Sequence, residues 1–309
     1  MTDLGARMST LVILNPWSGR GRGARMRGQL ERGLRESGQP FELVLTTGPG
    51  HAVGLARDAA ASGIKRVIVA GGDGAIHEAV NGLMKAPLTD DGATRAALGV
   101  VPLGTGNDFA KLVGVYKMPP EIAALRMMRA GEDRFDLGRV GNEYFDNSMG
   151  AGFDAEVVRH ANKIRRLRGV AVYLAAIYRT FATFRAPHLE IVSEQHRESG
   201  RMMMMCAAIG VCGGGSFYLT PQADPRDGQL DVCLIRKVGL MTFLMAVPKV
   251  MKGTHTALDE VSLFRTNSLT IRSADKRTLL LHLDGELRES GSSEVEVTIE
   301  PRRLRVLIA

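Results

Sequence analysis

Three glycine-bearing loops carry most of the residues that could do chemistry. They read "NPWSGRGRG" (15–23), "GGDGA" (71–75) and "PLGTGNDFA" (102–110). Each follows an apolar, β-branched run, so each stands where a strand is expected to end. Glycine lets backbone N–H groups approach a ligand closely, and the N-terminus of a following helix favours phosphate. Together the loops predict a nucleotide site, whereas any one of them alone could be a tight turn with Asp73 as the helix N-cap.

Carboxylates gather in two further segments. In "LDGE" (283–286), residues i and i+2 of an extended strand would face one side, which predicts that Asp284 and Glu286 share a face. One acid could then accept a hydroxyl proton while the other positions substrate or metal. Without wider context the segment is a turn with solvated acids. The segment "ADPRDGQLD" (223–231) is either a turn or a loop of oxygen ligands for a hard cation.

The common nucleotide fingerprints are missing. Neither GxxxxGK[ST] nor GxGxxG occurs, which excludes a P-loop and disfavours a dinucleotide site of the usual kind. The three cysteines form no CxxC pair, so neither a zinc site nor a disulfide scaffold is expected.

The elements that position these loops follow from the hydrophobic pattern. Strands alternate with helices up to about residue 130, which predicts a parallel sheet whose ligand loops lie at the strand C-termini. From residue 136 short alternating stretches dominate, interrupted by helical stretches at about 157–184 and 239–252. We therefore predict an α/β protein with an N-terminal Rossmann-like three-layer nucleotide-binding domain (1–135) and a C-terminal antiparallel β-sandwich domain (136–309). The last strand, at about 300–309, either ends the second domain or returns to the first.

Charge and length limit the partners. The 309 residues carry a net charge of +7, which favours polyanions, but the basic patches lack the interleaved aromatic residues that stack on nucleic acid bases. No apolar run approaches the roughly 20 residues that span a bilayer. We expect a cytoplasmic protein without a nucleic-acid partner, with peripheral contact to the inner face of an anionic membrane as an additional site of action. The oligomeric state is open, a homodimer included.

Two helical stretches could contact lipid. The stretch 159–185 has seven Lys or Arg residues and apolar residues at 3–4 spacing, among them Ile164 and Leu167. It could lie on anionic lipid or pack in the core with a solvated basic face. The stretch 239–252, rich in Met, Leu and Val, could line a lipid-tail pocket or simply pack.

In this order and spacing, "NPWSG", "GGDGAIHEAVNGL" and "PLGTGNDFA" resemble the diacylglycerol kinase catalytic domain family, in particular its bacterial lipid kinases, which are related to sphingosine and ceramide kinases. The resemblance continues through "FDNSMGAGFDAEV" (145–157), "CGGGSFYLTPQADPRDGQLDV" (212–232) and "LDGE", and covers nearly the whole chain. It implies an ATP- and Mg²⁺-dependent kinase that phosphorylates a lipid hydroxyl.

The resemblance also implies roles for individual residues. Glu286 would be the general base, supported by Asp284, and Asp73 would handle the Mg²⁺-bound phosphates with help from Asp108. A structural Mg²⁺ would be held by Asp224, Asp227 and Gln229. The implied nucleotide contacts are Asn15, Pro16, Trp17, Ser18, Gly19, Thr46, Gly72, Asp73, Gly74, Ala75, Ile76, His77, Glu78, Thr105, Gly106, Asn107 and Asp108.

One departure from the family pattern is Ala75, which stands where the family usually has threonine. The lost hydroxyl predicts weaker nucleotide binding rather than loss of activity. The sequence leaves open whether the acceptor is diacylglycerol, a sphingoid base, ceramide or a soluble alcohol. It also leaves open a catalytically silent protein that binds nucleotide or lipid, for which Ala75 is the only support.

Overall fold

The computed structural model describes residues 9–161 and 170–309. The chain forms two compact units. The first comprises Met1–Phe135 together with Arg302–Ala309, and the second comprises Asp136–Pro301.

The first unit is built on a parallel sheet with strand order β2-β1-β3-β4. Its strands are near-continuous apolar runs, as is typical of sheets covered on both faces. The end of β15 (Glu294–Ile308) extends the sheet, because Val306 pairs in parallel with Leu98 of β4. The other strands are β1 (Thr10–Leu14), β2 (Glu42–Leu45), β3 (Arg66–Gly71) and β4 (Ala97–Pro102).

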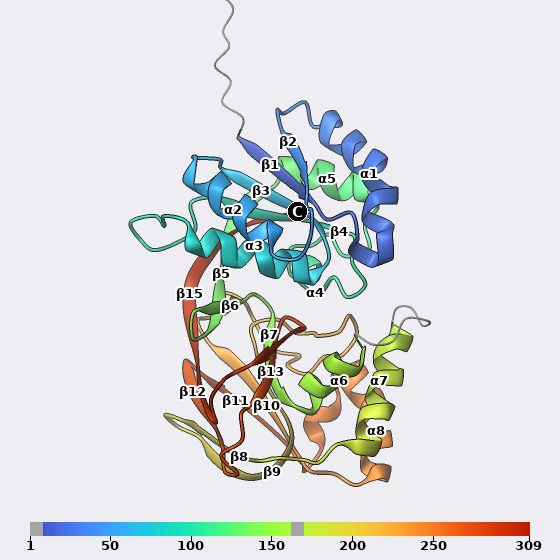
Figure 1. Ribbon diagram of the computed structural model, residues 1–309, viewed down its shortest axis with the longest axis vertical. Coiled ribbons are helices and arrows are strands. Elements are labelled where there is room, and N and C mark those ends of the chain that lie inside the picture. The colour runs from blue at the N-terminus through green and yellow to red at the C-terminus, as the bar shows by residue number, and fades with distance from the viewer. Residues whose placement is uncertain (1–8, 162–169) are drawn as a thin grey trace, which may run out of the picture. The chain divides into compact units, whose positions relative to one another are not determined.

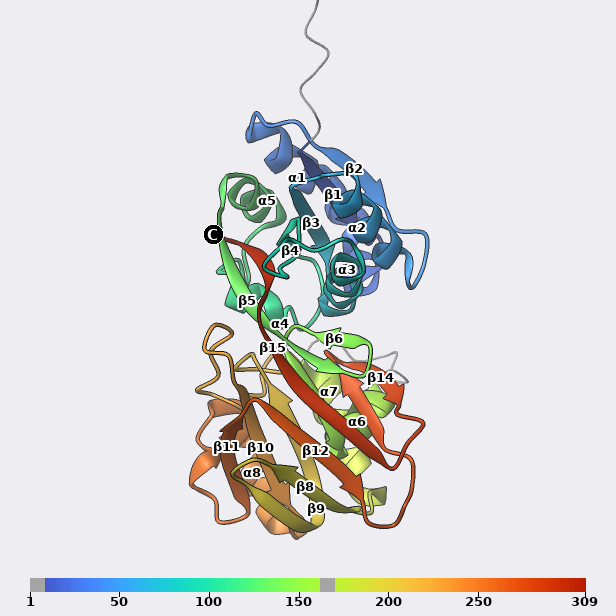
Figure 2. The ribbon, with the colours of Figure 1, turned by 90° about the vertical axis from the view of Figure 1, so that its left-hand side faces the viewer.

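Helices cover both faces of this sheet (Figures 1 and 2). Helices α1 (Ser18–Glu36) and α5 (Pro120–Arg129) pack together on one face, and α2 (His51–Ala61) and α3 (Asp73–Lys85) pack together on the other. The short α4 (Asp108–Leu112) follows the third loop. The predicted Rossmann-like three-layer domain is confirmed.

The second unit is a mainly antiparallel β structure, also as predicted. Its central strand, β9, pairs with β8 through its first half and with β7 and β10 through its second half. The strands are β5 (Gly131–Val140), β6 (Glu143–Phe145), β7 (Ser148–Gly152), β8 (His188–Ser193), β9 (Arg197–Ala208), β10 (Leu230–Arg236), β11 (Val261–Thr266), β12 (Ser268–Ser273), β13 (Leu280–Leu283), β14 (Glu286–Glu289) and the first part of β15.

Alternation along β9 divides the apolar side chains between two cores. Met205 and Ala207 join a core made of strand residues, whereas Cys206 and Ala208 join a core shared with three helices. The helices are α6 (Phe153–Ala161), α7 (Val170–Thr183) and α8 (Leu240–Lys252). The expectation of a single helix over 157–184 falls partly on residues 162–169, including Ile164 and Leu167, which lie outside the described residues.

One strand differs from the sequence prediction, and another resolves an open alternative. The segment 261–266, not predicted as a strand, forms β11 because it pairs with β10 along its whole length. The last strand, for which the sequence left two alternatives, is the end of β15, which continues past Pro301 into the first unit, with Arg302 at a φ of 55°. Strand β5 also has residues in both units. Among the described residues, no helix combines the length and apolar character needed to cross a bilayer.

Candidate active site

The three glycine-bearing loops meet at the carboxyl ends of β1, β3 and β4, as predicted. Ser18 of the first loop accepts a hydrogen bond on Oγ from the Gly72 N–H (3.2 Å). The second and third loops touch through their backbones, since a Cβ on Gly104 would lie 2.5 Å from the Gly72 Cα. A Cβ on Gly19, whose φ is +57°, would lie 2.3 Å from the Leu103 carbonyl oxygen. These glycines are therefore required by close backbone approach as well as by turn geometry.

Asp73 fastens the second loop to the third. One carboxylate oxygen accepts from the Asn107 N–H and the other from the Asp108 N–H, both at 2.7 Å, with a longer bond from the Phe109 N–H at 3.4 Å. Asn107 is in the left-handed region (φ 53°) and closes its own turn by accepting from the Gly104 N–H at 2.9 Å. The carboxylate predicted to handle phosphate-bound metal thus holds the loop that would surround the phosphates.

The same contacts set the acidity of Asp73. Burial raises its pKa to about 6, and the nearby Asp108 carboxylate adds to this, while the three backbone N–H donors act in the opposite direction. Asp108 itself is buried and pairs with Lys111 Nζ at 2.6 Å. The proton of Asp73 can therefore be lost and regained close to neutral pH.

We predict that Gly104→Ala disrupts nucleotide binding. The new methyl group would press against the Gly72 backbone, which cannot rotate away as a side chain could, so the two loops must separate. Steric overlap of this kind typically costs about 1–3 kcal/mol, so we expect a loss of nucleotide affinity of roughly 5- to 100-fold. This affinity is measured by adding ATP and following the fluorescence of Trp17. Trp17 is the only tryptophan and is 58 % exposed in the first loop.

Gly28→Ala is the matched control for this prediction. Gly28 lies in α1 with open space where the methyl would go, so the change is expected to stabilise the helix by about 0.5–1 kcal/mol. Equal nucleotide affinities in the two variants would contradict the assigned contact.

The other predicted nucleotide contacts differ in accessibility. Trp17 and Thr105 are exposed, whereas Ile76 and His77 are buried, so these two can contribute only from within the fold. Glu78 accepts hydrogen bonds from the Gly50 N–H (2.7 Å) and the Ala52 N–H (3.1 Å). It therefore holds the start of α2, a role that the sequence pattern does not indicate.

Thr46 lies at the end of β2, beside the first loop. Its N–H donates to the Leu14 carbonyl (2.9 Å), and among the described residues its buried hydroxyl oxygen has no hydrogen-bond partner. An unsatisfied buried hydroxyl is costly in a native structure. A ligand atom would remove that cost, which agrees with the predicted nucleotide contact.

Ala75 lies in the first turn of α3, where its N–H donates to the Gly72 carbonyl (3.0 Å). We predict that Ala75→Thr strengthens ATP binding roughly 2- to 10-fold, because one added hydrogen bond is worth about 0.5–1.5 kcal/mol. Ala75→Val adds similar volume without the hydroxyl and is the control. The Trp17 fluorescence titration compares the ATP affinities of the two variants. Equal affinities would show that the added hydroxyl makes no hydrogen bond to the nucleotide.

The second unit contradicts the predicted geometry of "LDGE". Asp284 and Gly285 have φ values of 50° and 84° and form the two-residue loop between β13 and β14, so Glu286 pairs opposite Leu283. Asp-Gly is a preferred sequence for such primed hairpin turns. Asp284 and Glu286 therefore do not share the face of an extended strand, and the period-2 argument was wrong because it ran across a turn.

Asp284 instead fixes the hairpin to the segment before β7. Its carboxylate accepts from the N–H groups of Asp146, Asn147 and Ser148, each at 3.0 Å, and its own N–H donates to the Ser148 carbonyl (2.8 Å). Glu286 follows as the exposed first residue of β14. The hairpin thus holds one acid inward as a structural bridge and presents the other outward to solvent or a ligand.

A buried histidine, His282, lies beside this hairpin, and the sequence patterns did not identify it as a candidate site residue. His282 Nε2 lies 3.3 Å from an Asp154 oxygen, and its Nδ1 accepts from the Gly285 N–H at 3.3 Å. A Cβ on Gly150 would lie 1.7 Å from the same Asp154 oxygen. The available signal was the histidine that interrupts the apolar run "LLLHL" (279–283).

The predicted metal loop is a cluster of acids with two arginines. Asp224 and Asp227 each accept a local backbone N–H, and Asp227 also lies 3.6 Å from Arg265. Burial raises the pKa of Asp231, and the charges of Asp227 and Asp224 raise it further, whereas Arg265 lowers it. Gln229, two residues after Asp227, adds an amide oxygen to the segment. Oxygen donors that repel one another suit a hard cation, so the residues fit Mg²⁺.

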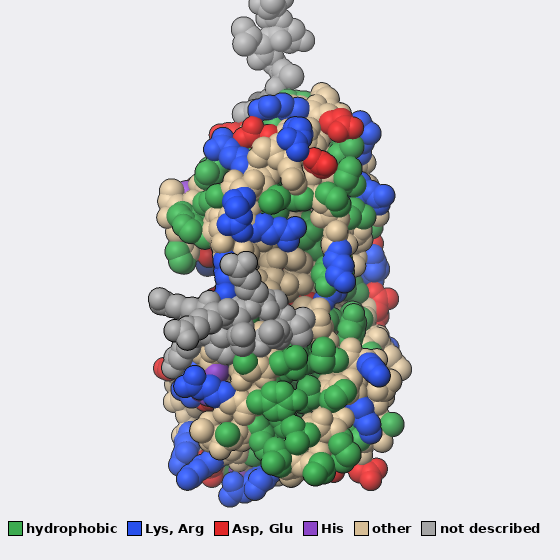
Figure 3. All heavy atoms as spheres, turned by 90° about the vertical axis from the view of Figure 1, so that its right-hand side faces the viewer, with side chains coloured by type: hydrophobic (Ala, Val, Ile, Leu, Met, Phe, Trp, Pro, Cys, Tyr) green, Lys and Arg blue, Asp and Glu red, His purple; other side chains and the backbone are tan. Residues whose placement is uncertain are grey.

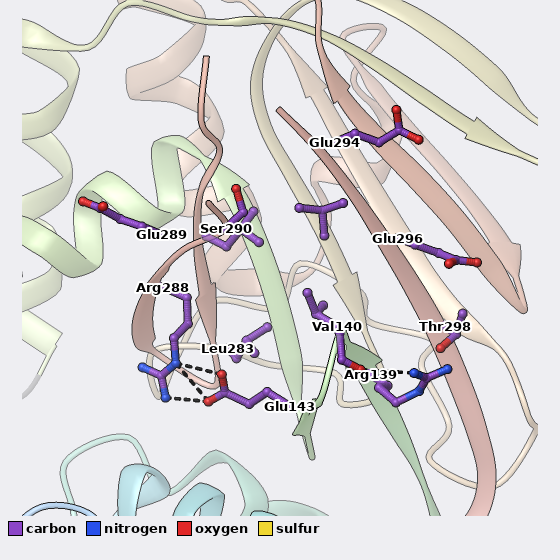
Figure 4. A pocket seen from close by; sticks show the side chains of 13 residues that line it. Arg139, Val140, Glu143, Leu283, Arg288, Glu289, Ser290, Glu294, Glu296 and Thr298 are labelled. Carbon is purple, nitrogen blue, oxygen red and sulfur yellow. Dashed lines mark hydrogen bonds and ion pairs between the residues drawn. The ribbon is translucent and has the colours of Figure 1, made fainter. Parts of the chain in front are cut away.

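A hollow of about 400 Å³ lies beside the β13–β14 hairpin (Figure 4). Arg288 and Glu143 form an ion pair at its end, and Glu289, Glu294 and Glu296 lie along its wall. Val140, Leu281, Leu283 and Val295 also line it, so the hollow combines charged and aliphatic side chains.

Comparison with known proteins places these features in a family. Residues 9–140 match the model of the diacylglycerol kinase catalytic domain, and residues 147–308 match that of the YegS C-terminal NAD kinase beta sandwich-like domain. A diacylglycerol kinase of Bacillus subtilis is 29% identical over 276 residues, covering 89% of this chain and 88% of that protein.

A protein of Pseudomonas syringae named "Probable lipid kinase YegS-like" is 31% identical over 260 residues, covering 82% of this chain and 79% of its own. A crystal structure of a diacylglycerol kinase from Bacillus anthracis shares the fold, with a TM-score of 0.73 at 18% identity over 97% of both chains. The chain therefore belongs to the family of lipid and diacylglycerol kinases that join a diacylglycerol kinase catalytic domain to a YegS-type C-terminal β-sandwich domain.

Proposed function

We propose that the chain transfers the γ-phosphoryl group of ATP to a hydroxyl of diacylglycerol or a similar lipid alcohol. The observation that carries the proposal is the junction of three loops by Ser18, Asp73 and Gly104. The junction gathers backbone N–H groups and the start of α3 at one sheet edge, the kind of place where phosphate binds. Family membership supports kinase chemistry.

In the proposed reaction the loops bind the triphosphate and orient its γ-phosphoryl group. Glu286 accepts the proton of the lipid hydroxyl as its oxygen bonds to the γ-phosphorus, and the bond from that phosphorus to the bridging oxygen breaks to release ADP. Asp73 and Asp284 act by holding the segments 107–109 and 146–148 in place. Positioning and charge neutralisation supply most of the rate enhancement.

Mg²⁺ bound with ATP would neutralise phosphate charge during this transfer. Both oxygens of Asp73 already accept backbone N–H groups, so its part in handling metal would be indirect. A second, structural Mg²⁺ would be held by Asp224, Asp227 and Gln229.

We predict that Mg²⁺ stabilises the protein and that Asp227→Asn removes the effect. Asparagine keeps the oxygen that accepts the Gln229 N–H but removes the charge that would bind the cation. Saturation at 100 times the dissociation constant stabilises by about 2.7 kcal/mol, which raises the melting temperature by several degrees. Thermal unfolding with and without MgCl₂ measures this, with NaCl at equal ionic strength and Asp275→Asn as controls. An equal Mg²⁺ response in both variants would refute the site.

The test of the proposed function is transfer of label from [γ-³²P]ATP to a panel of alcohols. The panel contains diacylglycerol, a sphingoid base, ceramide and glycerol, each with and without Mg²⁺. Label extracted into organic solvent with diacylglycerol is the expected result. Label only in a water-soluble product would identify a soluble acceptor instead. Nucleotide binding with no product from any acceptor would indicate a catalytically silent protein and overturn the proposal.

A further inference from the structure

Helix α8 in the second unit presents apolar side chains on two sides. Phe243, Val247 and Val250 are buried in the core that the helices share with β9 and β10. The opposite side is exposed although it carries Leu240, Met241, Leu244 and Met245, with Met241 69 % exposed. These residues recur at i, i+1, i+4 and i+5, so they form one stripe along the helix. Figure 3 shows hydrophobic side chains gathered on this face of the second unit.

Helix α7 extends the stripe. The Tyr178 ring lies 6.3 Å from the ring of Phe243 and is itself exposed, while Phe181 stacks on Phe243 at 4.1 Å. We define the α8 patch as Leu240, Met241, Leu244, Met245 and Tyr178. An exposed cluster of large apolar residues on a monomer marks an interaction surface.

The charges beside the patch indicate what covers it. Lys249 and Lys252 are exposed in the last turn of α8, and Arg179 and Arg185 are exposed on and after α7. Neither Leu240–Lys252 nor Val170–Thr183 contains an acidic residue. A second copy placed symmetrically on the patch would bring like charges together, which disfavours self-association. An anionic bilayer surface complements both the apolar stripe and its basic edge.

We infer that the α8 patch inserts into the headgroup region of an anionic membrane, and so brings the second unit to its lipid substrate. The inference rests on the proposed lipid kinase function. Leucine and methionine would enter the acyl boundary, Tyr178 would lie at headgroup level, and Lys249 and Lys252 would contact lipid phosphates. The contact face is thus α8 with the end of α7.

Flotation of the full chain with vesicles, without ATP, tests the inference. We expect binding to vesicles of phosphatidylcholine with 30 mol % phosphatidylglycerol and a loss of about 10-fold or more in Met241→Ser/Met245→Ser. Lys249→Glu/Lys252→Glu should abolish the preference for anionic over neutral vesicles. Leu263→Ser and Lys276→Glu, both exposed and outside the patch, should bind like the unchanged chain. Circular dichroism verifies that each variant is folded.

Parallel measurements separate this inference from the proposed function. A chain that phosphorylates diacylglycerol in detergent micelles but does not float overturns the membrane contact and leaves the kinase intact. A chain that floats through the patch but phosphorylates no lipid supports the contact and overturns the kinase. A dimer that Met241→Ser/Met245→Ser converts to monomer, with flotation unchanged, would show that a second copy covers the patch and overturn the membrane contact.

Discussion

Glu286→Gln is expected to lower the turnover number about 10³-fold, within the range of 10²–10⁴ that general-base catalysis provides. Glutamine has nearly the same shape as glutamate but cannot accept the hydroxyl proton at neutral pH. A 10³-fold loss corresponds to about 4 kcal/mol of lost transition-state stabilisation. Initial rates of ³²P transfer to diacylglycerol at saturating ATP measure it, since the change should fall on kcat rather than on KM for nucleotide.

Three controls make this result specific. Glu289→Gln changes the exposed acid at the other end of β14, so it should leave the rate within a factor of about two. ATP titration by Trp17 fluorescence should give the same affinity for Glu286→Gln as for the unchanged chain. The melting temperature should also be unchanged, because Asp284 rather than Glu286 bonds to the segment 146–148. A turnover number within tenfold of the original would remove Glu286 from the role of base.

The parallel half of the fold could be predicted because each local signal agreed with the global arrangement. The strand Arg66–Gly71 is apolar and buried after its first residue and ends in glycine, and Ile76, Ala79, Val80 and Leu83 are all buried along one side of α3. The convergence of three loops then follows from topology, because parallel strands place their carboxyl ends at one edge. What the sequence could not provide is how the loops hold one another.

That internal bonding changes the roles of several acids. Asp73, Glu78 and Asp284 lie within sequence motifs, which suggests that they contact a ligand or a metal. In the structure each carboxylate accepts two or three backbone N–H groups from a distant segment. Such bonds join residues between 26 and 138 positions apart, so no local pattern encodes them.

The hairpin at 284–285 shows a different limit. "LDGE" contains both a strand pattern and an Asp-Gly turn signal, and the choice between them decides on which side Glu286 emerges. The turn prevails because Asp284 and Gly285 adopt positive φ and Asp284 bonds to Asp146–Ser148. The helical stretch expected over 157–184 can be compared with the structure only in part, because the described residues stop at 161 and resume at 170.

Asp73→Asn is expected to weaken ATP binding by about 10-fold or more and to lower stability. Asparagine offers one oxygen where the carboxylate offers two, so its amide N–H₂ would face a backbone N–H of residues 107–109. A buried donor left without an acceptor costs about 1–3 kcal/mol. Trp17 titration and thermal unfolding measure the two effects. Asp58→Asn, at an exposed acid on α2, should change neither.

The raised pKa of Asp73 extends this prediction to pH. With a pKa of about 6 in the folded chain and an ordinary value near 3.8, the folded state holds more protons between these values. The contribution of Asp73 to stability is therefore greatest below pH 4 and declines as the pH rises through 6. Nucleotide binding should change in the opposite direction, because only the ionised carboxylate accepts all three N–H bonds. ATP affinity should rise between pH 5 and 7, and the rise should be absent in Asp73→Asn. An affinity that is constant over this range in the unchanged chain would show that the ionisation of Asp73 does not control the loops.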